Sequence, residues 1–322
     1  MCSALLFGAL GAHKIITMSL NYTLNINGKL LNLDKVKVMG ILNVTDDSFY
    51  AGSRCKHQDE IATKVKLLTE EGADIIDIGA CSTRPDAQAV DAEEECRRLA
   101  DALRTIRDIV PDAILSVDTF RADIARMAVE EFGVAIVNDI SAGAFDPEMF
   151  PTVAKLGVPY VLTHGCSQSE CQHKNATSQG DNLPDAPTTA NPKKDDTGLS
   201  DIDIVEQVML FFSEKVQQLR DLGQKDIILD PGFGFGKTLD ENYKLLANLN
   251  MLKILGLPIL VGVSRKSMIY KMLGTTPDQA LNGTTAIHTI CLQQHTCDII
   301  RAHDVRAARE AIVLTEKTQR FR

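Results

Sequence analysis

Eight short, continuously apolar segments recur along this chain, and they limit the possible folds more than any other feature. Uninterrupted apolarity over so few residues is typical of strands that are buried on both faces of a parallel sheet. The segments lie at 36–43, 74–78, 113–118, 134–138, 158–163, 226–230, 258–263 and 298–303.

Helical patterns separate these segments. Apolar residues recur every three or four positions over 92–110 and again over 205–219. Asp91 followed by Glu94 predicts a capping box at the start of the first of these helices. Eight strand–helix repeats predict the α/β class and a (β/α)8 TIM barrel. A doubly wound open sheet is the alternative, but its glycine-rich fingerprint is missing after the first strand.

Three segments lie outside this repeat. Asn27-Gly28 between apolar residues predicts an N-terminal β-hairpin. Residues 1–17 are expected to be a non-core extension, with a misplaced start favoured over a leader because no basic residue precedes the apolar run. Residues 18–322 then form a single barrel domain. A polar insert at about 166–200 predicts a long loop after the fifth barrel strand, either an active-site lid or a tolerated insertion.

Charge and cysteine content exclude several classes of protein. The 322 residues carry 34 basic and 43 acidic side chains, a net charge of −9, which disfavours a nucleic-acid binder. No apolar run reaches 18 residues, so no membrane span is expected. The eight cysteines form no CxxC pair, which favours reduced thiols and a cytoplasmic location.

Polar side chains end nearly every expected strand, and strand ends of a barrel converge on one mouth. A single buried polar residue is usually a structural hydrogen bonder, but six or seven at one rim indicate a binding site. The strand-end residues are Asn43, Asp77, Asp118, Asn138, His164, Asp230, Ser264 to Lys266, and Arg301 to Asp304.

These residues suggest two ligand chemistries. Two carboxylates, an amide and a cation suit a flat heterocycle with an amino-pyrimidinone edge; they are Asp118, Asn138, Asp230 and Lys266. A second group of mainly positive or hydrogen-bond-donating side chains suits a phosphate group with Mg²⁺. Its members are Arg301, His303, Asn43 and Arg84. The glycine-rich segment 232–237 lacks the spacing of a phosphate loop and is interpreted as a tight turn.

Seven groups of motifs, in order from about Val38 to Val305, resemble the dihydropteroate synthase family. They are MGILNVT (39–45) with DSF (47–49), DIG (77–79) with STRP (82–85), SVDT (116–119), ND (138–139), DPG (230–232) with GFGKT (234–238), SRKS (264–267) and RAHDV (301–305).

The resemblance implies a homodimeric transferase that joins 6-hydroxymethyl-7,8-dihydropterin diphosphate to 4-aminobenzoate and is inhibited by sulfonamides. It implies that Asp118, Asn138, Asp230 and Lys266 hold the pterin, and that Arg301, His303 and Asn43 hold the diphosphate and Mg²⁺. Thr83 and Arg84 would lie on a closing loop, and Phe235, Lys266 and Ser267 would line the aminobenzoate pocket. The catalytic set so implied is Asp118, Asp230, Lys266, Arg301 and His303.

The sequence departs from the family pattern at Asp46, at Cys81 and at the segment 163–165, where the family has a Met-His-Met-like run. A methyltransferase that uses a methylated folate and a non-catalytic pterin-binding paralogue are the alternatives. The first should lack the STRP and SRKS segments, and the second should have lost strand-end acids. His164, Cys166, Cys171 and His173 lack a standard zinc spacing and are interpreted as exposed residues of the insert.

Overall fold

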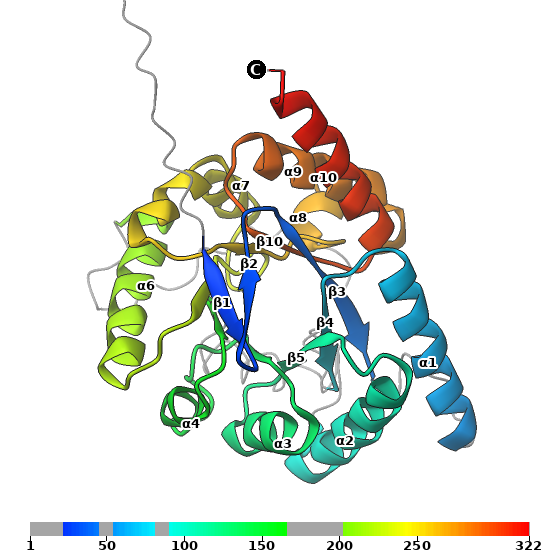
Figure 1. Ribbon diagram of the computed structural model, residues 1–322. Coiled ribbons are helices and arrows are strands. Elements are labelled where there is room, and N and C mark those ends of the chain that lie inside the picture. Colours follow the sequence, from blue (N-terminus) through cyan, green and yellow to red (C-terminus); the bar gives the residue numbers. More distant parts are fainter. Residues whose placement is uncertain (1–21, 45–53, 81–89, 166–201, 322) are drawn as a thin grey trace, which may run out of the picture.

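The computed structural model describes residues 22–44, 54–80, 90–165 and 202–321. Within these ranges strands alternate with helices around a central parallel sheet (Figure 1). The strands are β1 (Thr23–Ile26), β2 (Lys29–Asn32), β3 (Lys37–Asn43), β4 (Ile75–Gly79), β5 (Ile114–Asp118), β6 (Ile136–Asp139), β7 (Tyr160–Thr163), β8 (Ile227–Asp230), β9 (Leu260–Val261) and β10 (Ile299–Ala302).

Helices cover the outside of this sheet. They are α1 (Arg54–Glu70), α2 (Ala92–Ile109), α3 (Ala122–Phe132), α4 (Met149–Leu156), α6 (Ile204–Asp221), α7 (Leu239–Ala247), α8 (Ser267–Tyr270), α9 (Leu281–Gln293) and α10 (Val305–Gln319), with 3-10 turns η3 (Leu249–Leu255) and η4 (Pro277–Gln279). In the described residues, no helix is both long and apolar enough to cross a membrane.

The predicted barrel is confirmed. Strands β3 to β10 form one eight-stranded sheet in the order β8-β7-β6-β5-β4-β3-β10-β9, in which neighbouring strands pair in parallel. A parallel bridge between Leu229 and Ile259 brings the two ends of this sheet together. Each of the eight apolar segments overlaps one strand, although β4 and β6 each run one residue past the predicted end. β9 is the shortest because only two of its residues pair regularly.

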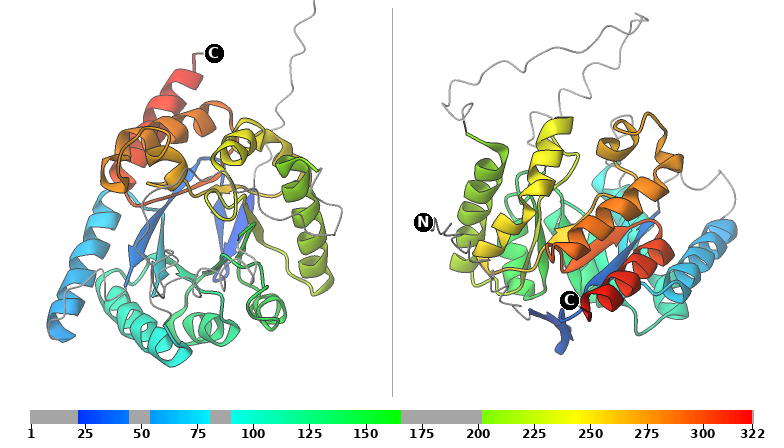
Figure 2. Two further views of the ribbon diagram at one scale, coloured as in Figure 1. Left: turned by 180° about the vertical axis from the view of Figure 1, so that it is seen from behind. Right: turned by 90° about the horizontal axis from the view of Figure 1, so that it is seen from above.

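The hairpin is confirmed and closes the amino-terminal end of the barrel (Figures 1 and 2). Asn27 and Gly28 have φ of 49° and 84°, so both turn residues adopt the left-handed conformation that tight hairpins need. The hairpin side chains Leu24 and Ile26 are buried in a cluster with the inward-facing residues Met39, Ile75, Ile136, Val161, Ile228, Leu260 and Ile299. The barrel therefore has an apolar floor with the hairpin packed beneath it.

The helix start at Asp91 agrees only in part with its prediction. The Asp91 carboxylate accepts a hydrogen bond from the Glu94 backbone N–H at 2.8 Å, as an N-cap should. The Glu94 carboxylate instead accepts hydrogen bonds from Arg97 and Arg98, so the reciprocal half of the predicted capping box was wrong. Residues 1–17 and the whole insert at about 166–200 lie outside the described residues. The domain boundary at residue 17 stays a prediction.

Candidate active site

Arg301 lies at the centre of a buried ion-pair network in the mouth of the barrel. Its Nε donates to Asp77 Oδ2 and its Nη2 donates to Asp118 Oδ2, both at 2.7 Å. Asn138 Nδ2 donates to the same Asp77 oxygen at 2.9 Å. The Asp77 side chain is fully buried, and those of Asp118 and Arg301 are only 17% and 20% exposed. The network therefore joins strands β10, β4, β5 and β6 by their side chains.

Strand periodicity explains why these residues meet. Side chains two positions apart share a face, so Asp77 points the same way as Ile75 in the apolar floor, and Arg301 the same way as Ile299. The same rule carries Asn138 and Asp230 inward, one step above Ile136 and Ile228. The polar layer thus lies directly above the apolar floor, at the end of the barrel opposite the hairpin.

Two carboxyl groups of this layer, those of Asp118 and Asp230, have raised pKa values. Burial, together with the charges of Asp77, Asp139 and Asp230, raises the pKa of Asp118 to about 7 against the opposing attraction of Arg301. Burial also raises the pKa of Asp230, although Lys266 and a 2.8 Å hydrogen bond from the Gly232 N–H favour its charged form. Perturbed carboxyl groups in one cleft are typical of a functional site.

Lys266 and Phe235 form a second group on the loops that follow β9 and β8. The Lys266 ammonium lies 4.2 Å from the centroid of the Phe235 ring, a cation–π contact, and donates a hydrogen bond to the Phe233 carbonyl. Lys266 is the N-cap of α8 and Ser267 is its first residue. A cation and an aromatic face side by side can bind a flat, anionic aromatic molecule.

The glycine-rich segment after β8 is the predicted tight turn. Gly232 has a φ of 66°, and a Cβ at this position would lie 2.0 Å from the His164 carbonyl oxygen. The Lys237 ammonium donates to the carbonyls of His164, Gly232 and Phe235 at 3.0, 2.9 and 3.1 Å. Lys237 thus holds the turn against the end of β7.

His303 and Asn43 lie at two further strand ends. Ser264 Oγ accepts a hydrogen bond from the His303 backbone N–H at 3.1 Å and lies 3.1 Å from His303 Nδ1. Asn43 is the last residue of β3 and is half-buried.

In the described ranges, no group of three His, Cys, Asp or Glu side chains is arranged to hold a metal ion.

The comparisons with known proteins identify the family. Residues 39–303 match the family model described as pterin binding enzyme. The dihydropteroate synthase of Clostridium beijerinckii is 34% identical over 296 residues, covering 91% of this chain and 98% of the relative. The chain belongs to the dihydropteroate synthase family. The Bacillus subtilis dihydropteroate synthase, 37% identical over 274 residues, covers 85% of each chain.

Solved structures of the family agree with this fold. The dihydropteroate synthase of Xanthomonas albilineans with 4-aminobenzoic acid has a TM-score of 0.77 and 35% identity, covering 92% of this chain and 98% of its own. The synthase of the same organism in complex with 7,8-dihydropteroate has a TM-score of 0.74 and 32% identity, with 92% and 99% covered.

Not every predicted site residue can be placed. Thr83 and Arg84, with the family departures Asp46 and Cys81, lie outside the described residues, so their roles stay predictions. Thr163, the departure that is described, ends β7 in register with Asp230. It is buried, and its hydroxyl has no hydrogen-bond partner in the part of the chain that the structure describes.

The interpretation of His164 as an exposed insert residue was wrong. Its ring packs edge-on against Phe211 at 4.8 Å between centroids, and against Phe212 at 6.5 Å. Burial and the nearby Lys237 lower the pKa of His164 to about 3, so the ring is neutral. His164 therefore anchors the end of β7 to α6. Cys166, Cys171 and His173 lie outside the described residues.

Two residues of the site had no role assigned from the sequence. Asp77 was counted among the strand-end residues, but its bonds to Arg301 and Asn138 make it the buried anchor of the network. Its position two residues after the floor residue Ile75 is the signal that indicates an inward side chain. Ser264 lies directly before Arg265 and Lys266, which are the residues that draw attention in this segment. No local pattern links Ser264 to His303, which is 39 positions away.

Proposed function

We infer that this protein condenses 6-hydroxymethyl-7,8-dihydropterin diphosphate with 4-aminobenzoate, releasing 7,8-dihydropteroate and diphosphate. The observation that carries this inference is the hydrogen-bonded network of Asp77, Asp118, Asn138 and Arg301, which gathers family motifs from four strands at one barrel mouth. The relatives reported above are dihydropteroate synthases, which favours this reaction over a folate-dependent methyl transfer.

The inward polar layer is the proposed pterin site. The carboxylates of Asp118 and Asp230 can each accept N–H donors of a pterin ring, and the amide of Asn138 can both donate and accept. The Lys266 ammonium can donate to the ring carbonyl or a ring nitrogen. The buried position of these groups supports the proposal, because such groups need partners that water cannot supply.

The chemistry proposed for this layer is stabilisation of separated charge. The C–O bond to the diphosphate breaks, which leaves positive charge on the pterin methylene carbon. The carboxylate of Asp118 opposes that charge through the ring, and Arg301 and His303 donate to the departing oxygens. The neutral nitrogen of 4-aminobenzoate then attacks the methylene carbon, and the new C–N bond forms as that nitrogen loses a proton to water or to the released diphosphate. A neutral aniline needs no strong base.

Ser264 suits His303 to this role. Its hydroxyl oxygen accepts the His303 backbone N–H, and its own proton can be donated to Nδ1, 3.1 Å away. The imidazole proton then lies on Nε2, which can donate to a phosphate oxygen. We therefore propose His303 as a leaving-group ligand that donates from Nε2.

The aminobenzoate pocket is proposed between Phe235, Lys266 and Ser267. The Phe235 ring can stack on the substrate ring, while Lys266 and the Ser267 hydroxyl can contact its polar atoms. Thr83 and Arg84 are proposed for the loop that closes over this pocket. The support for these two residues is the family motif alone.

A magnesium ion is the proposed cofactor, held by Asn43 and the substrate diphosphate. Mg²⁺ is bound in proteins through one or two side-chain oxygens, several waters and substrate phosphates, so one amide oxygen at the mouth fits it. When bound, the ion would neutralise charge on the leaving diphosphate. The residue that positions it, Asn43, comes from the strand next to Arg301.

We also propose a homodimer in a reducing compartment such as the cytoplasm. Exposed apolar side chains on α9 and α10, Ile290, Val313 and Leu314, make this helix pair the candidate contact face. Light scattering during size-exclusion chromatography tests the proposed dimer.

The compartment is a separate proposal. Cys96, Cys291 and Cys297 are free thiols, which supports a reducing environment.

A coupled diphosphate-release assay tests the function. Release that needs both pterin diphosphate and 4-aminobenzoate, with 7,8-dihydropteroate recovered by chromatography, is the expected result. Diphosphate release that is independent of the arylamine would point to a hydrolase. Tight pterin binding without release in either case would point to a non-catalytic paralogue.

A further inference from the structure

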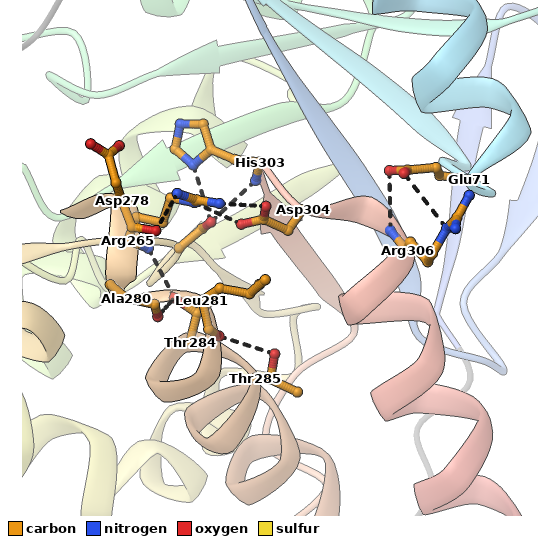
Figure 3. A network of polar contacts seen from close by, with 11 residues as sticks. Glu71, Arg265, Asp278, Ala280, Leu281, Thr284, Thr285, His303, Asp304 and Arg306 are labelled. Carbon is orange, nitrogen blue, oxygen red and sulfur yellow. Dashed lines mark hydrogen bonds and ion pairs between the residues drawn. The ribbon is translucent and has the colours of Figure 1, made fainter. Parts of the chain in front are cut away.

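Two adjacent contacts join the loop after β9 to the loop after β10 (Figure 3). Ser264 meets His303, as described above. At the next position of each loop, Arg265 Nε and Nη2 donate to Asp304 Oδ2 and Oδ1 at 2.8 and 2.7 Å. This two-point geometry is the strong, directional form of an ion pair. We call these four residues the loop clamp.

Arg265 has an unusual backbone conformation that its contacts support. Its φ is 54°, in the left-handed region that residues with a Cβ seldom adopt. The turn is closed by a hydrogen bond from the Lys266 N–H to the Val263 carbonyl at 3.1 Å. Such a conformation costs of the order of 1 kcal/mol and persists where the surroundings over-determine it.

The surroundings of Arg265 come from three other segments. Besides the pair with Asp304, its Nη1 donates to the Asp278 carbonyl and its backbone N–H donates to Thr284 Oγ1, both at 3.1 Å. Figure 3 shows Arg265 between these groups at the start of α9 and the end of β10. The conformation of residue 265 is therefore set by tertiary contacts.

The clamp adjoins Lys266 and includes His303, two residues with proposed functions. Lys266 follows Arg265 directly, so the conformation of residue 265 decides where the Lys266 side chain points. His303 precedes Asp304 directly and is also tied to Ser264, which is 5% exposed. Lys266 belongs to the proposed pterin and aminobenzoate side of the site, and His303 to the diphosphate side.

We propose that Arg265 and Asp304 act as a positioning pair, which holds the group that binds the pterin at a fixed distance from the group that binds the leaving diphosphate. Neither residue needs to touch substrate for this. The inference rests on the proposed function, because it takes the roles of Lys266 and His303 from it. A displacement of about 1 Å in such groups can lower turnover about 100-fold, so a modest shift suffices to be measured.

A set of variants tests the pair. Arg265→Gly removes the side chain while glycine still adopts the left-handed turn. Asp304→Asn keeps the shape and removes the charge, and Arg265→Lys keeps the charge and removes the two-point geometry. Arg306→Ala is the matched control. Arg306 lies two residues after Asp304 and also forms an ion pair, with Glu71, but its side chain is 70% exposed and lies outside the loop clamp.

Turnover is the first readout. Each of the three clamp variants should lower kcat about tenfold or more, and the double variant Arg265→Gly with Asp304→Asn should be no more than about twofold worse than the slower single variant. Arg306→Ala should match wild type. Wild-type turnover in Asp304→Asn with loss in Arg265→Gly would mean that Arg265 contacts substrate directly. Wild-type turnover in Arg265→Lys, or losses that multiply in the double variant, would also overturn the positioning role.

Binding of inorganic diphosphate, measured by calorimetry, is the second readout and needs no catalysis. The clamp variants should bind it about tenfold more weakly because His303 is misplaced. Arg265→Gly should also weaken binding of the free pterin alcohol, because Lys266 follows residue 265 directly. Wild-type diphosphate affinity in all three variants would refute the clamp even in a protein that turns nothing over. If Arg265→Gly fails to fold, as judged by its melting curve, Arg265→Lys and Asp304→Asn carry the same comparison.

Discussion

Replacing Asp118 with Asn tests the centre of the proposed site. The change keeps the size and shape of the side chain, but removes the charge that Arg301 pairs with at 2.7 Å. Arg301 keeps its second bond to Asp77, so the guanidinium is not left unpaired. We expect the protein to fold normally and to lose activity.

The size of the loss follows from the bonds involved. A hydrogen bond to a charged group contributes about 1.5 to 3 kcal/mol, which corresponds to about ten- to 150-fold in turnover if it is made fully in the transition state. The loss of charge opposite the developing methylene cation adds to this. We therefore expect kcat to fall by about 100-fold or more.

The ionisation of Asp118 supplies a second measurement. Its pKa is raised to about 7, so the ionised form that accepts pterin N–H donors is lost as the pH falls through 7. Affinity for the free pterin alcohol should be about tenfold lower at pH 6 than at pH 8. The alcohol is the right ligand because it has no phosphate to titrate. Asp118→Asn should show no such step.

The stability of the variant provides the control. The folded pKa of Asp118 lies above the ordinary value of 3.8, so its ionisation costs stability as the pH rises from about 4 to about 7. Asn cannot ionise, and the variant should melt at the same or a higher temperature than wild type at pH 8. Wild-type turnover in the variant, or equal pterin affinity of the wild type at pH 6 and pH 8, would refute the assigned role.

Three further expectations concern other parts of the molecule. His303→Ala should weaken binding of pterin diphosphate about tenfold while leaving the pterin alcohol unaffected, as calorimetry can show, and equal losses for both would contradict its role as a phosphate ligand. Leu24→Ala, in the hairpin that closes the barrel floor, should lower the free energy of unfolding by about 2 to 5 kcal/mol in urea titrations without changing KM, whereas the exposed Leu30→Ala should change it by less than about 0.5 kcal/mol. Sulfonamides should compete with 4-aminobenzoate at Phe235 and Lys266, and inhibition that excess 4-aminobenzoate cannot relieve would argue against a shared pocket.

The barrel could be predicted from the sequence because its signals are local. A strand that is buried on both faces must be apolar throughout, and a covering helix must be apolar on one face, so eight repeats of the two patterns leave few alternatives. Asn27-Gly28 specified its turn for a similar reason, since few residue pairs tolerate two left-handed conformations. The position of the hairpin beneath the barrel was not predicted. Leu24 and Ile26 contact floor residues as far along the sequence as Ile299, and no local pattern indicates such contacts.

The polar layer was partly predictable. Strand alternation places Asp118, Asn138, Asp230 and Arg301 at one mouth, and the sequence assigns them a flat polar ligand and a phosphate. It does not show that Arg301 bonds to Asp77 and Asp118, because these partners are 224 and 183 positions away and meet only when the sheet closes. The raised pKa of Asp118 is likewise a product of that closure, since burial among other carboxylates is its cause.

The tertiary structure alone decided which polar residues take part in the site. His164 directly follows the barrel strand β7, yet its ring turns to Phe211 and Phe212 of α6 and is neutral there. Ser264 and Asp304 were counted among the strand-end residues, but no local pattern indicates their contacts with His303 and Arg265, which tie two loops together. Composition and period determine which element a residue belongs to. The direction of a side chain at the end of a strand depends on the loop that follows and on what packs against it, and both come from distant parts of the chain.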